Sequence, residues 1–240
     1  MVPGDTVPTG TSMTEKGEPD IAPEMWTSSH KAAFERGVKE KRLRLIGKPL
    51  SEGGIEGFWV PKYMVDKDPS LATIKGVIAN AKLFKNPEDP SRSAIMGCPS
   101  GWGCQISTTN LYKALELKKA GFDLIDPGSS AGLAGSISRA YERKKPWLGY
   151  YWGPTAILGK YEMVMVDFGS GIDEKHYINC ILKTDCKDPK VTMIPRAPVQ
   201  TVVTEKFASR SPDAIEYLGK RSFKHDEINE VLAWMKDNQA

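Results

Sequence analysis

Residues 122–152, FDLIDPGSSAGLAGSISRAYERKKPWLGYYW, carry the pattern that decides the fold. A short apolar run at 122–125 precedes a Gly/Pro/Ser turn, and a stretch with helical character follows at 131–144. A second strand-like run, rich in aromatic residues, occupies 147–152. Strands that alternate with helices of this length predict βαβ units and a mainly parallel sheet. The sequence therefore predicts an α/β fold.

The same alternation extends to both sides of this stretch. We predict further strands at 93–96, 161–166 and 198–204, and further helices at 28–45, 70–80, 106–120, 211–219 and 225–238. Residues 1–24 are rich in Gly, Pro and Thr, which favours a loop or an edge strand. The apolar run at 57–65 contains Pro61, which confines it to a sheet edge or to a segment that crosses between lobes.

Composition and charge exclude several classes of protein. The formal net charge is +3 and both signs of charge are spread along the chain, so the basic surface of a nucleic-acid-binding protein is missing. No run of the roughly 18 apolar residues that a membrane-spanning helix needs occurs. With 240 residues and 40% hydrophobic content, the chain can form one large domain or two lobes.

The cysteines form two local pairs. Cys98 and Cys104 enclose five residues, as do Cys180 and Cys186. The knuckles of four-cysteine zinc sites usually enclose about two to four residues, so disulfides are the favoured interpretation. Free buried thiols and a metal site stay open as alternatives. Disulfides would place folding outside the reducing cytosol.

The motifs of common enzymes are absent from the sequence. It contains no Gly-x-Ser-x-Gly, His-Glu-x-x-His or Walker motif, and its three histidines, His30, His176 and His225, stand in unrelated contexts. We therefore predict that the protein is not an enzyme, with no catalytic residue, no cofactor and no metal site.

Three tryptophans stand in turns, where a core aromatic residue is not expected. Trp26 precedes a predicted helix, Trp102 lies in a Gly-rich loop between two cysteines, and Trp152 ends a strand at the predicted carboxyl edge of the sheet. Ligands of open α/β folds bind at that edge. Because tryptophan faces attract cations, these residues indicate a cage for a methylated ammonium group. Trp59, Trp147 and Trp234 lie on apolar patterns and are interpreted as core residues.

A zwitterionic ligand also needs a site for its anionic end. Backbone N–H groups of Gly103 and Cys104 lie at the predicted start of a helix, where the helix dipole favours an anion. His30 lies one helical turn beyond Trp26, so we expect both on one helix face, with His30 donating a hydrogen bond.

Four motifs resemble the glycine betaine/proline betaine substrate-binding proteins of ABC transporters. They are residues 17–26 (GEPDIAPEMW), 57–63 (GFWVPKY), 97–104 (GCPSGWGC) and 149–155 (GYYWGPT). The resemblance implies cage residues Trp26, Trp102 and Trp152, carboxylate donors Gly103, Cys104 and His30, and a Cys98–Cys104 disulfide. It offers no counterpart for a pairing of Cys180 with Cys186.

The resemblance implies a two-lobed periplasmic-binding-protein fold of type II, with two crossover hinge strands that close on the ligand. We expect lobe one to comprise residues 1–62 and 163–240, and lobe two residues 63–162. Because the chain opens on an extended Val-Pro-Gly run without a preceding strand and helix, lobe one is expected to lack its N-terminal unit.

The expected function is a monomeric extracytoplasmic binding protein, in the periplasm or on the outer face of the membrane. It would hold glycine betaine, proline betaine or choline in an aromatic cage between the lobes and deliver it to the permease of an ABC transporter. Two alternatives stay open: a cysteine-dependent thiol-disulfide enzyme that uses Cys98 or Cys104, and a sensory ligand-binding domain of the same fold.

Overall fold

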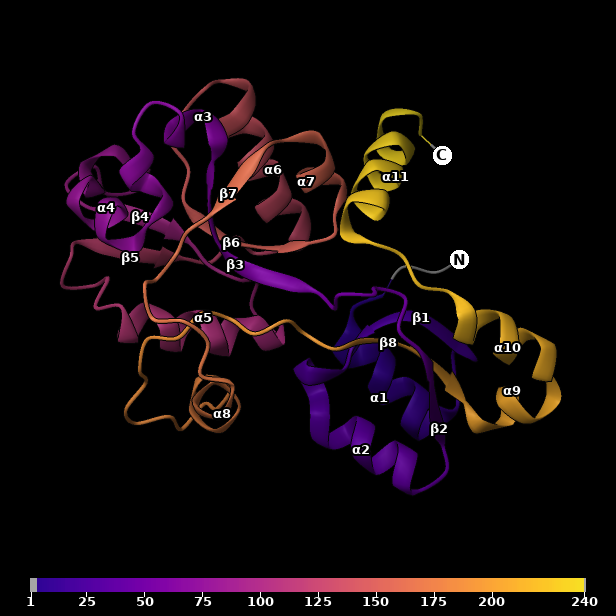
Figure 1. The fold of residues 1–240 in the computed structure, drawn as a ribbon. Coiled ribbons are helices and arrows are strands. Elements are labelled where there is room, and N and C mark those ends of the chain that lie inside the picture. Colours follow the sequence, from indigo (N-terminus) through magenta and orange to yellow (C-terminus); the bar gives the residue numbers. More distant parts are fainter. Residues whose placement is uncertain (1–3, 240) are drawn as a thin grey trace. The chain divides into compact units, whose positions relative to one another are not determined.

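A computed structural model describes residues 4–239, except for the side chain of His30. The chain divides into two compact units, Met1–Gly54 with Arg196–Ile228 and Ile55–Pro195 with Asn229–Ala240. Figure 1 follows the chain through both by colour. The chain passes from one unit to the other three times, and not only along the two crossover strands that we expected.

The first unit is built on a three-stranded antiparallel sheet with strand order β1-β8-β2. Its strands are β1 (Ile21–Trp26), β2 (Leu43–Gly47) and β8 (Val199–Thr204). Its helices are α1 (Thr6–Lys16), η1 (Thr27–His30), α2 (Lys31–Lys39), α9 (Glu205–Arg210), α10 (Pro212–Lys220) and the first turn of α11 (His225–Asp237).

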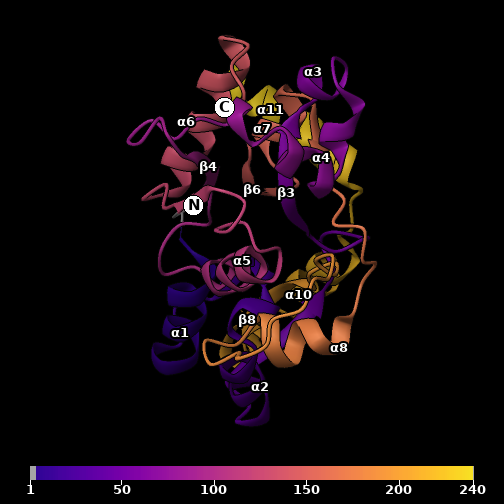
Figure 2. The same ribbon diagram turned by 90° about the vertical axis from the view of Figure 1, so that its left-hand side faces the viewer.

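Both faces of this sheet are covered, because successive residues of β8 point to opposite sides. Val202 packs in a core with Met13 of α1 and Phe34 of α2. Its neighbour Val203 packs in a second core with Phe207 of α9. Figure 2 shows α1 and α2 of this unit beside β8. The small sheet therefore forms the middle layer of a three-layer unit.

Two predictions for the first unit are wrong. Residues 6–16 form α1, although their Gly and Thr content favoured a loop. Met13 of this helix is buried in one core with Phe34 of α2, and such tertiary packing outweighs weak helix propensity. The helix expected at 28–45 ends at Lys39, and β2 follows where its second half was predicted.

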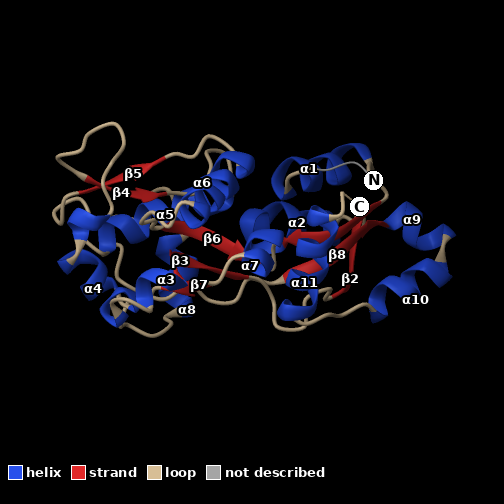
Figure 3. Ribbon diagram, turned by 90° about the horizontal axis from the view of Figure 1, so that it is seen from above, coloured by secondary structure: helices blue, strands red, loops and turns tan. Residues whose placement is uncertain are grey.

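The second unit is built on a five-stranded sheet with strand order β5-β4-β6-β3-β7. Its strands are β3 (Ile55–Pro61), β4 (Ser93–Met96), β5 (Phe122–Ile125), β6 (Gly149–Gly153) and β7 (Met163–Met165). Its helices are α3 (Lys62–Val65), η2 (Pro69–Ala72), α4 (Ile74–Ala79), η3 (Ala81–Leu83), α5 (Gly103–Ala114), α6 (Ser130–Glu142), α7 (Ala156–Lys160), α8 (Glu174–His176), the π-helix η4 (Tyr177–Ile181) and the rest of α11. Figure 3 separates these strands, in red, from the helices.

The βαβ prediction holds for part of this sheet. β4 pairs in parallel with β5 and β6, with α5 and α6 as connections, as the strand and helix pattern predicts. β3 instead pairs antiparallel with both β6 and β7. The expectation of a mainly parallel sheet is therefore only partly correct.

The pairing of β3 also explains why the units differ from the lobes that we predicted. Since β3 lies between β6 and β7, residues 55–62 and 163–195 belong to the second unit, and not to lobe one. The prediction that Pro61 confines this run to a sheet edge is wrong, because β3 is an inner strand. Pro61 is the last residue of β3 and pairs with Met163 at the end of the strand.

One continuous hydrophobic core fills the second unit. It joins fully buried side chains of the sheet, such as Phe58 and Ile95, to Val77 of α4, Leu111 of α5 and Leu133 of α6. Within residues 4–239, no helix combines the length and apolar character needed to cross a bilayer.

Candidate ligand-binding site

The loop between β4 and α5 holds Trp102. Cys98 and Cys104 form a disulfide that closes this loop on itself. Gly101 has a φ of 86°, in the left-handed region that residues with a side chain rarely adopt. The resulting turn places Trp102 in an extended conformation immediately before α5, which begins at Gly103.

A polar network fixes the outer side of this loop. Gln105 receives a hydrogen bond from the Gly101 N–H and donates one to the Ser100 hydroxyl. Ser100 in turn donates to the Asp126 carboxylate at the end of β5. The Ser100 hydroxyl, with the N–H of Gly128, lowers the pKa of Asp126, so the acceptor stays ionised at neutral pH. These hydrogen bonds attach the loop to Asp126, which follows β5, and to Gln105 in α5.

Trp102 and Trp152 come together, as the sequence predicts. Their ring centroids are 5.1 Å apart and the ring planes cross at 68°, an edge-to-face arrangement. Trp152 also lies against Tyr151, at 4.6 Å between centroids, and stacks at 6.4 Å with Tyr150. Neither tryptophan is fully buried. The second unit therefore holds two indole rings in direct contact, with their planes at 68°.

The start of α5 adjoins these rings. The N–H groups of Gly103 and Cys104 belong to the first turn of α5, where helical N–H groups have no partner within the helix. Among the described residues, no side chain caps this end. The first turn of α5 therefore offers two N–H donors and the positive end of a helix dipole next to Trp102.

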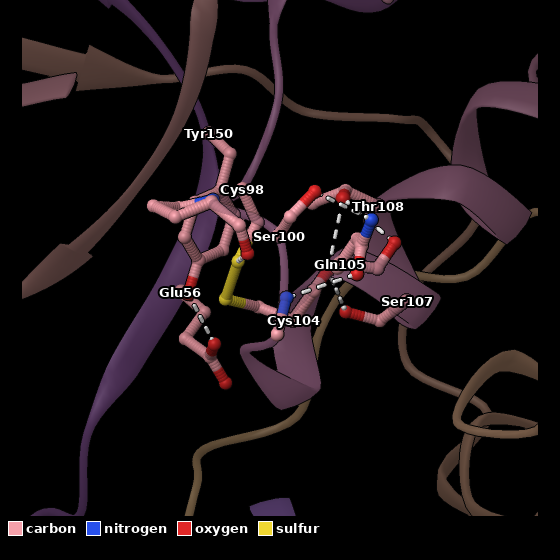
Figure 4. The surroundings of a disulfide bond; sticks show 10 residues. Glu56, Cys98, Ser100, Cys104, Gln105, Ser107, Thr108 and Tyr150 are labelled. Atoms are coloured by element: carbon pink, nitrogen blue, oxygen red, sulfur yellow. Dashed lines mark hydrogen bonds between the residues drawn. A yellow bond between two sulfur atoms is a disulfide. The ribbon is translucent and has the colours of Figure 1, made fainter. Parts of the chain in front are cut away.

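A partly buried polar pair, Glu56 and Tyr150, lies next to the disulfide (Figure 4). Figure 4 shows Glu56 and Tyr150 on one side of the Cys98–Cys104 bond and the first residues of α5 on the other. The Tyr150 hydroxyl donates to the Glu56 carboxyl group. Burial raises the pKa of both groups above their usual values, while the hydrogen bond from Tyr150 lowers that of Glu56 in part. Glu56 was not predicted as a site residue, although a lone acidic residue in an apolar strand is a signal that the sequence contains.

Trp26 lies in the first unit, at the end of β1. Its indole N–H donates to the Glu24 carboxylate, with 2.9 Å between Nε1 and Oε1. Its ring covers Gly54 so closely that a methyl group on this residue would lie 2.1 Å from two ring carbons. Glu24 therefore fixes the indole by a hydrogen bond, and Gly54 leaves the space that the ring occupies. The sequence did not reveal this role of Gly54.

Trp26 and His30 do not lie on one helix face, contrary to the prediction. Trp26 is instead the last residue of a strand. The backbone of His30 ends η1, and its side chain lies outside the described part of the structure.

All four cysteines form disulfides, Cys98 with Cys104 and Cys180 with Cys186. The disulfide interpretation is therefore confirmed over free thiols and a metal site. A cysteine-dependent enzyme requires a thiolate, so this oxidised chain does not favour that alternative.

The two disulfides allow a matched test of the Trp102 loop. The double variant Cys98→Ala/Cys104→Ala is expected to lose about 2 kcal/mol of stability, since the bridge closes a loop between residues six apart. It should also lose affinity for the quaternary-ammonium ligand that the motifs imply, because Trp102 and the N–H group of residue 104 are released. Denaturant unfolding and isothermal titration measure the two effects.

The control is Cys180→Ala/Cys186→Ala, which opens a bridge of the same sequence separation. It should lose similar stability and keep its affinity. An equal loss of affinity in both double variants would show that the Trp102 loop has no special role.

Comparisons with known proteins identify the family. The whole chain, residues 1–240, matches the substrate-binding domain of the ABC-type glycine betaine transport system. The glycine betaine/proline betaine-binding periplasmic protein of Escherichia coli K12 is 24% identical over 225 residues, which cover 90% of this chain. The aligned region spans 64% of that relative's length.

Two solved structures share the fold. A glycine betaine, L-proline ABC transporter binding protein (ProX) from Borrelia burgdorferi superposes with a TM-score of 0.66 at 19% identity, over 98% of this chain and 75% of that one. An ABC-transporter choline binding protein in complex with choline has a TM-score of 0.62 at 16% identity, over 97% and 70%. These likenesses confirm the two-lobed periplasmic-binding-protein fold. The match over the full chain confirms the resemblance that the motifs indicated: the chain belongs to the family of substrate-binding domains of ABC-type glycine betaine transport systems.

Proposed function

We propose that this chain binds glycine betaine or a related quaternary-ammonium compound, such as proline betaine or choline, outside the cytoplasm and delivers it to an ABC transporter permease. The observation that carries the proposal is the perpendicular pair of Trp102 and Trp152 beside the start of α5. One element suits a cation that cannot donate hydrogen bonds, and the other suits an anion. Glycine betaine carries both groups in one small molecule.

Binding of the trimethylammonium group follows from the charge distribution of the indole rings. The face of a tryptophan attracts a cation with about 0.5 to 2 kcal/mol, more when water is excluded. Two rings whose planes cross at 68° form a corner in which both can turn a face to the same group. We assign the ligand carboxylate to the N–H groups of Gly103 and Cys104, where the dipole of α5 adds to the hydrogen bonds.

The first unit contributes the remaining residues of the proposal. Trp26, held over Gly54, supplies the third cage wall, and His30 supplies a further donor to the carboxylate, in line with the family motifs. The periplasmic name of the Escherichia coli relative and the two disulfides support a location outside the cytosol. We propose that the protein acts as a monomer towards its permease.

Isothermal titration of the purified chain with glycine betaine tests the proposed function. Heat that fits one site with a dissociation constant in the micromolar range or tighter is the expected result. A folded sample, judged by cooperative thermal unfolding, that binds neither glycine betaine, proline betaine nor choline would contradict the proposal.

The variant His30→Ala separates the two kinds of ligand. Removing a donor to a carboxylate should weaken glycine betaine binding by about tenfold, the usual cost of a hydrogen bond to a charged group. Choline has no carboxylate, so its affinity should stay within about twofold. Titration of wild type and variant with both ligands measures this difference, and an equal loss for both ligands would exclude His30 as the carboxylate donor.

A further inference from the structure

Glu56 lies opposite Trp152 in the sheet of the second unit. It is the second residue of β3, and its Cα partner on the adjacent antiparallel strand is Trp152. Side chains of such directly opposed residues lie on the same face of the sheet with their Cβ atoms about 5 Å apart. Glu56 therefore shares the face and the immediate surroundings of Trp152.

The position along the sheet is also that of a ligand site. Trp152 is near the carboxyl end of β6, and β4, parallel to β6, runs into the Cys98–Cys104 loop at the same end. Since β3 runs antiparallel to β6, its first residues reach this end too. Ligands of open α/β sheets bind at the carboxyl ends of the parallel strands. Glu56 thus faces the edge that carries Trp102.

Glu56 has no cationic partner in the described part of the chain. None of the ion pairs there includes it, and no Lys or Arg contributes to the shift of its pKa. The hydroxyl of Tyr150 donates to Oε1, and no described residue donates to Oε2. A partly buried carboxyl group in an otherwise apolar strand is unfavourable unless something compensates its charge.

We propose that Glu56 is the counter-ion of the ligand's quaternary ammonium group and a specificity-determining residue of the site. This rests on the proposed function. The tryptophan faces attract a cation of any kind, whereas a fixed carboxylate discriminates by the net charge of the whole ligand. The Glu56 carboxylate therefore favours choline, which has a net charge of +1, over glycine betaine, whose own carboxylate it repels.

The substitution Glu56→Gln removes the charge and retains an oxygen that can accept the hydrogen bond from Tyr150. Choline affinity is expected to fall by about tenfold, the order of effect of one unscreened charge near a surface. Glycine betaine affinity should fall by only about threefold, because repulsion of its carboxylate is relieved at the same time. The uncharged isostere of choline, 3,3-dimethylbutan-1-ol, should bind with unchanged affinity.

Titrations of wild type, Glu56→Gln and Glu162→Gln with these three ligands test the proposal. Glu162 is an exposed carboxylate of the same unit, so its variant controls for net charge. An equal loss for all three ligands would overturn the counter-ion role in favour of a purely structural one, and a loss for the isostere as great as for choline would indicate recognition of the hydroxyl group. Unchanged choline affinity would also overturn it.

A second variant keeps the test valid if Glu56→Gln does not fold. Glu56→Asp moves the charge back by one methylene, so choline affinity should fall by about threefold while the isostere is unaffected. No change in the choline affinity of this variant would contradict the proposal. If folded wild type binds none of the three ligands, the proposed function itself fails, which is a different outcome from wild-type binding that is insensitive to Glu56.

Discussion

Trp102→Ala is expected to weaken glycine betaine binding by about 30-fold or more, which corresponds to about 2 kcal/mol. The variant removes one wall of the cage and also the edge-to-face partner of Trp152, whose ring lies 5.1 Å away. Trp152 is then free to turn toward Tyr150 or Tyr151, with which it already has ring contacts. Because the backbone N–H groups of α5 stay in place, residual binding of the carboxylate should persist.

Isothermal titration measures this loss, and Trp234→Ala is the matched control. The core interpretation of Trp234 is wrong, because its side chain lies on α11 and is 61% exposed. Its removal should therefore change neither affinity nor stability beyond about 0.5 kcal/mol. The melting temperature of Trp102→Ala should fall by a few degrees, since this half-buried side chain packs against the core of the second unit and against Trp152. A Trp102→Ala protein that binds glycine betaine as tightly as wild type would refute the aromatic cage.

The parts of the fold that could be predicted from the sequence are those set by local pattern. The runs that form β4, β5 and β8 are short, apolar and bounded by turn residues, and the structure has strands there. Ser211 and Pro212 predict the start of α10 correctly, although the Ser211 side chain makes no capping hydrogen bond. Such features depend on neighbouring residues, which a single sequence contains.

The parts that could not be predicted depend on contacts between distant residues. α1 contains Gly10, where a methyl group would lie 2.7 Å from the ring of Phe34, so this glycine permits close helix packing and does not mark a loop. In the same way, β3 reads as a crossing segment, yet its antiparallel pairing with β6 and β7 makes it an inner strand. No pattern within β3 specifies these partners.

The residues of the candidate site also differ in whether local sequence or a distant partner reveals them. Trp102 and Trp152 were recognisable because large aromatic residues in Gly-rich turns lack a local structural reason. Glu56 was not among the predicted site residues, because its proposed role depends on its cross-strand partner Trp152, which a single sequence does not reveal. The prediction that Trp26 shares a helix face with His30 is wrong because of a local boundary: the strand ends at Trp26 and the helix begins at Thr27.

Gly54→Ala is expected to weaken glycine betaine binding by about tenfold, although the residue has no side chain that could touch a ligand. The added methyl group would lie 2.1 Å from Cη2 and Cζ3 of Trp26, far below an ordinary contact distance, so the indole must leave its position. The backbone cannot yield easily, because Gly54 exchanges two hydrogen bonds with Ala197. Overpacking of this kind should also cost about 1 to 3 kcal/mol of stability.

A double-mutant cycle separates the displacement of Trp26 from other effects of the methyl group. In a Trp26→Phe background the two clashing ring atoms are absent, so Gly54→Ala should cost much less affinity and stability than in wild type, and the two substitutions should be strongly non-additive. Gly135→Ala in α6 is the control, since its methyl group meets only the end of the flexible Arg139 side chain. If the effects of Gly54→Ala and Trp26→Phe simply add, the methyl group acts on something other than the indole. Strong coupling would mean that a glycine outside the ligand contacts fixes the third wall of the cage.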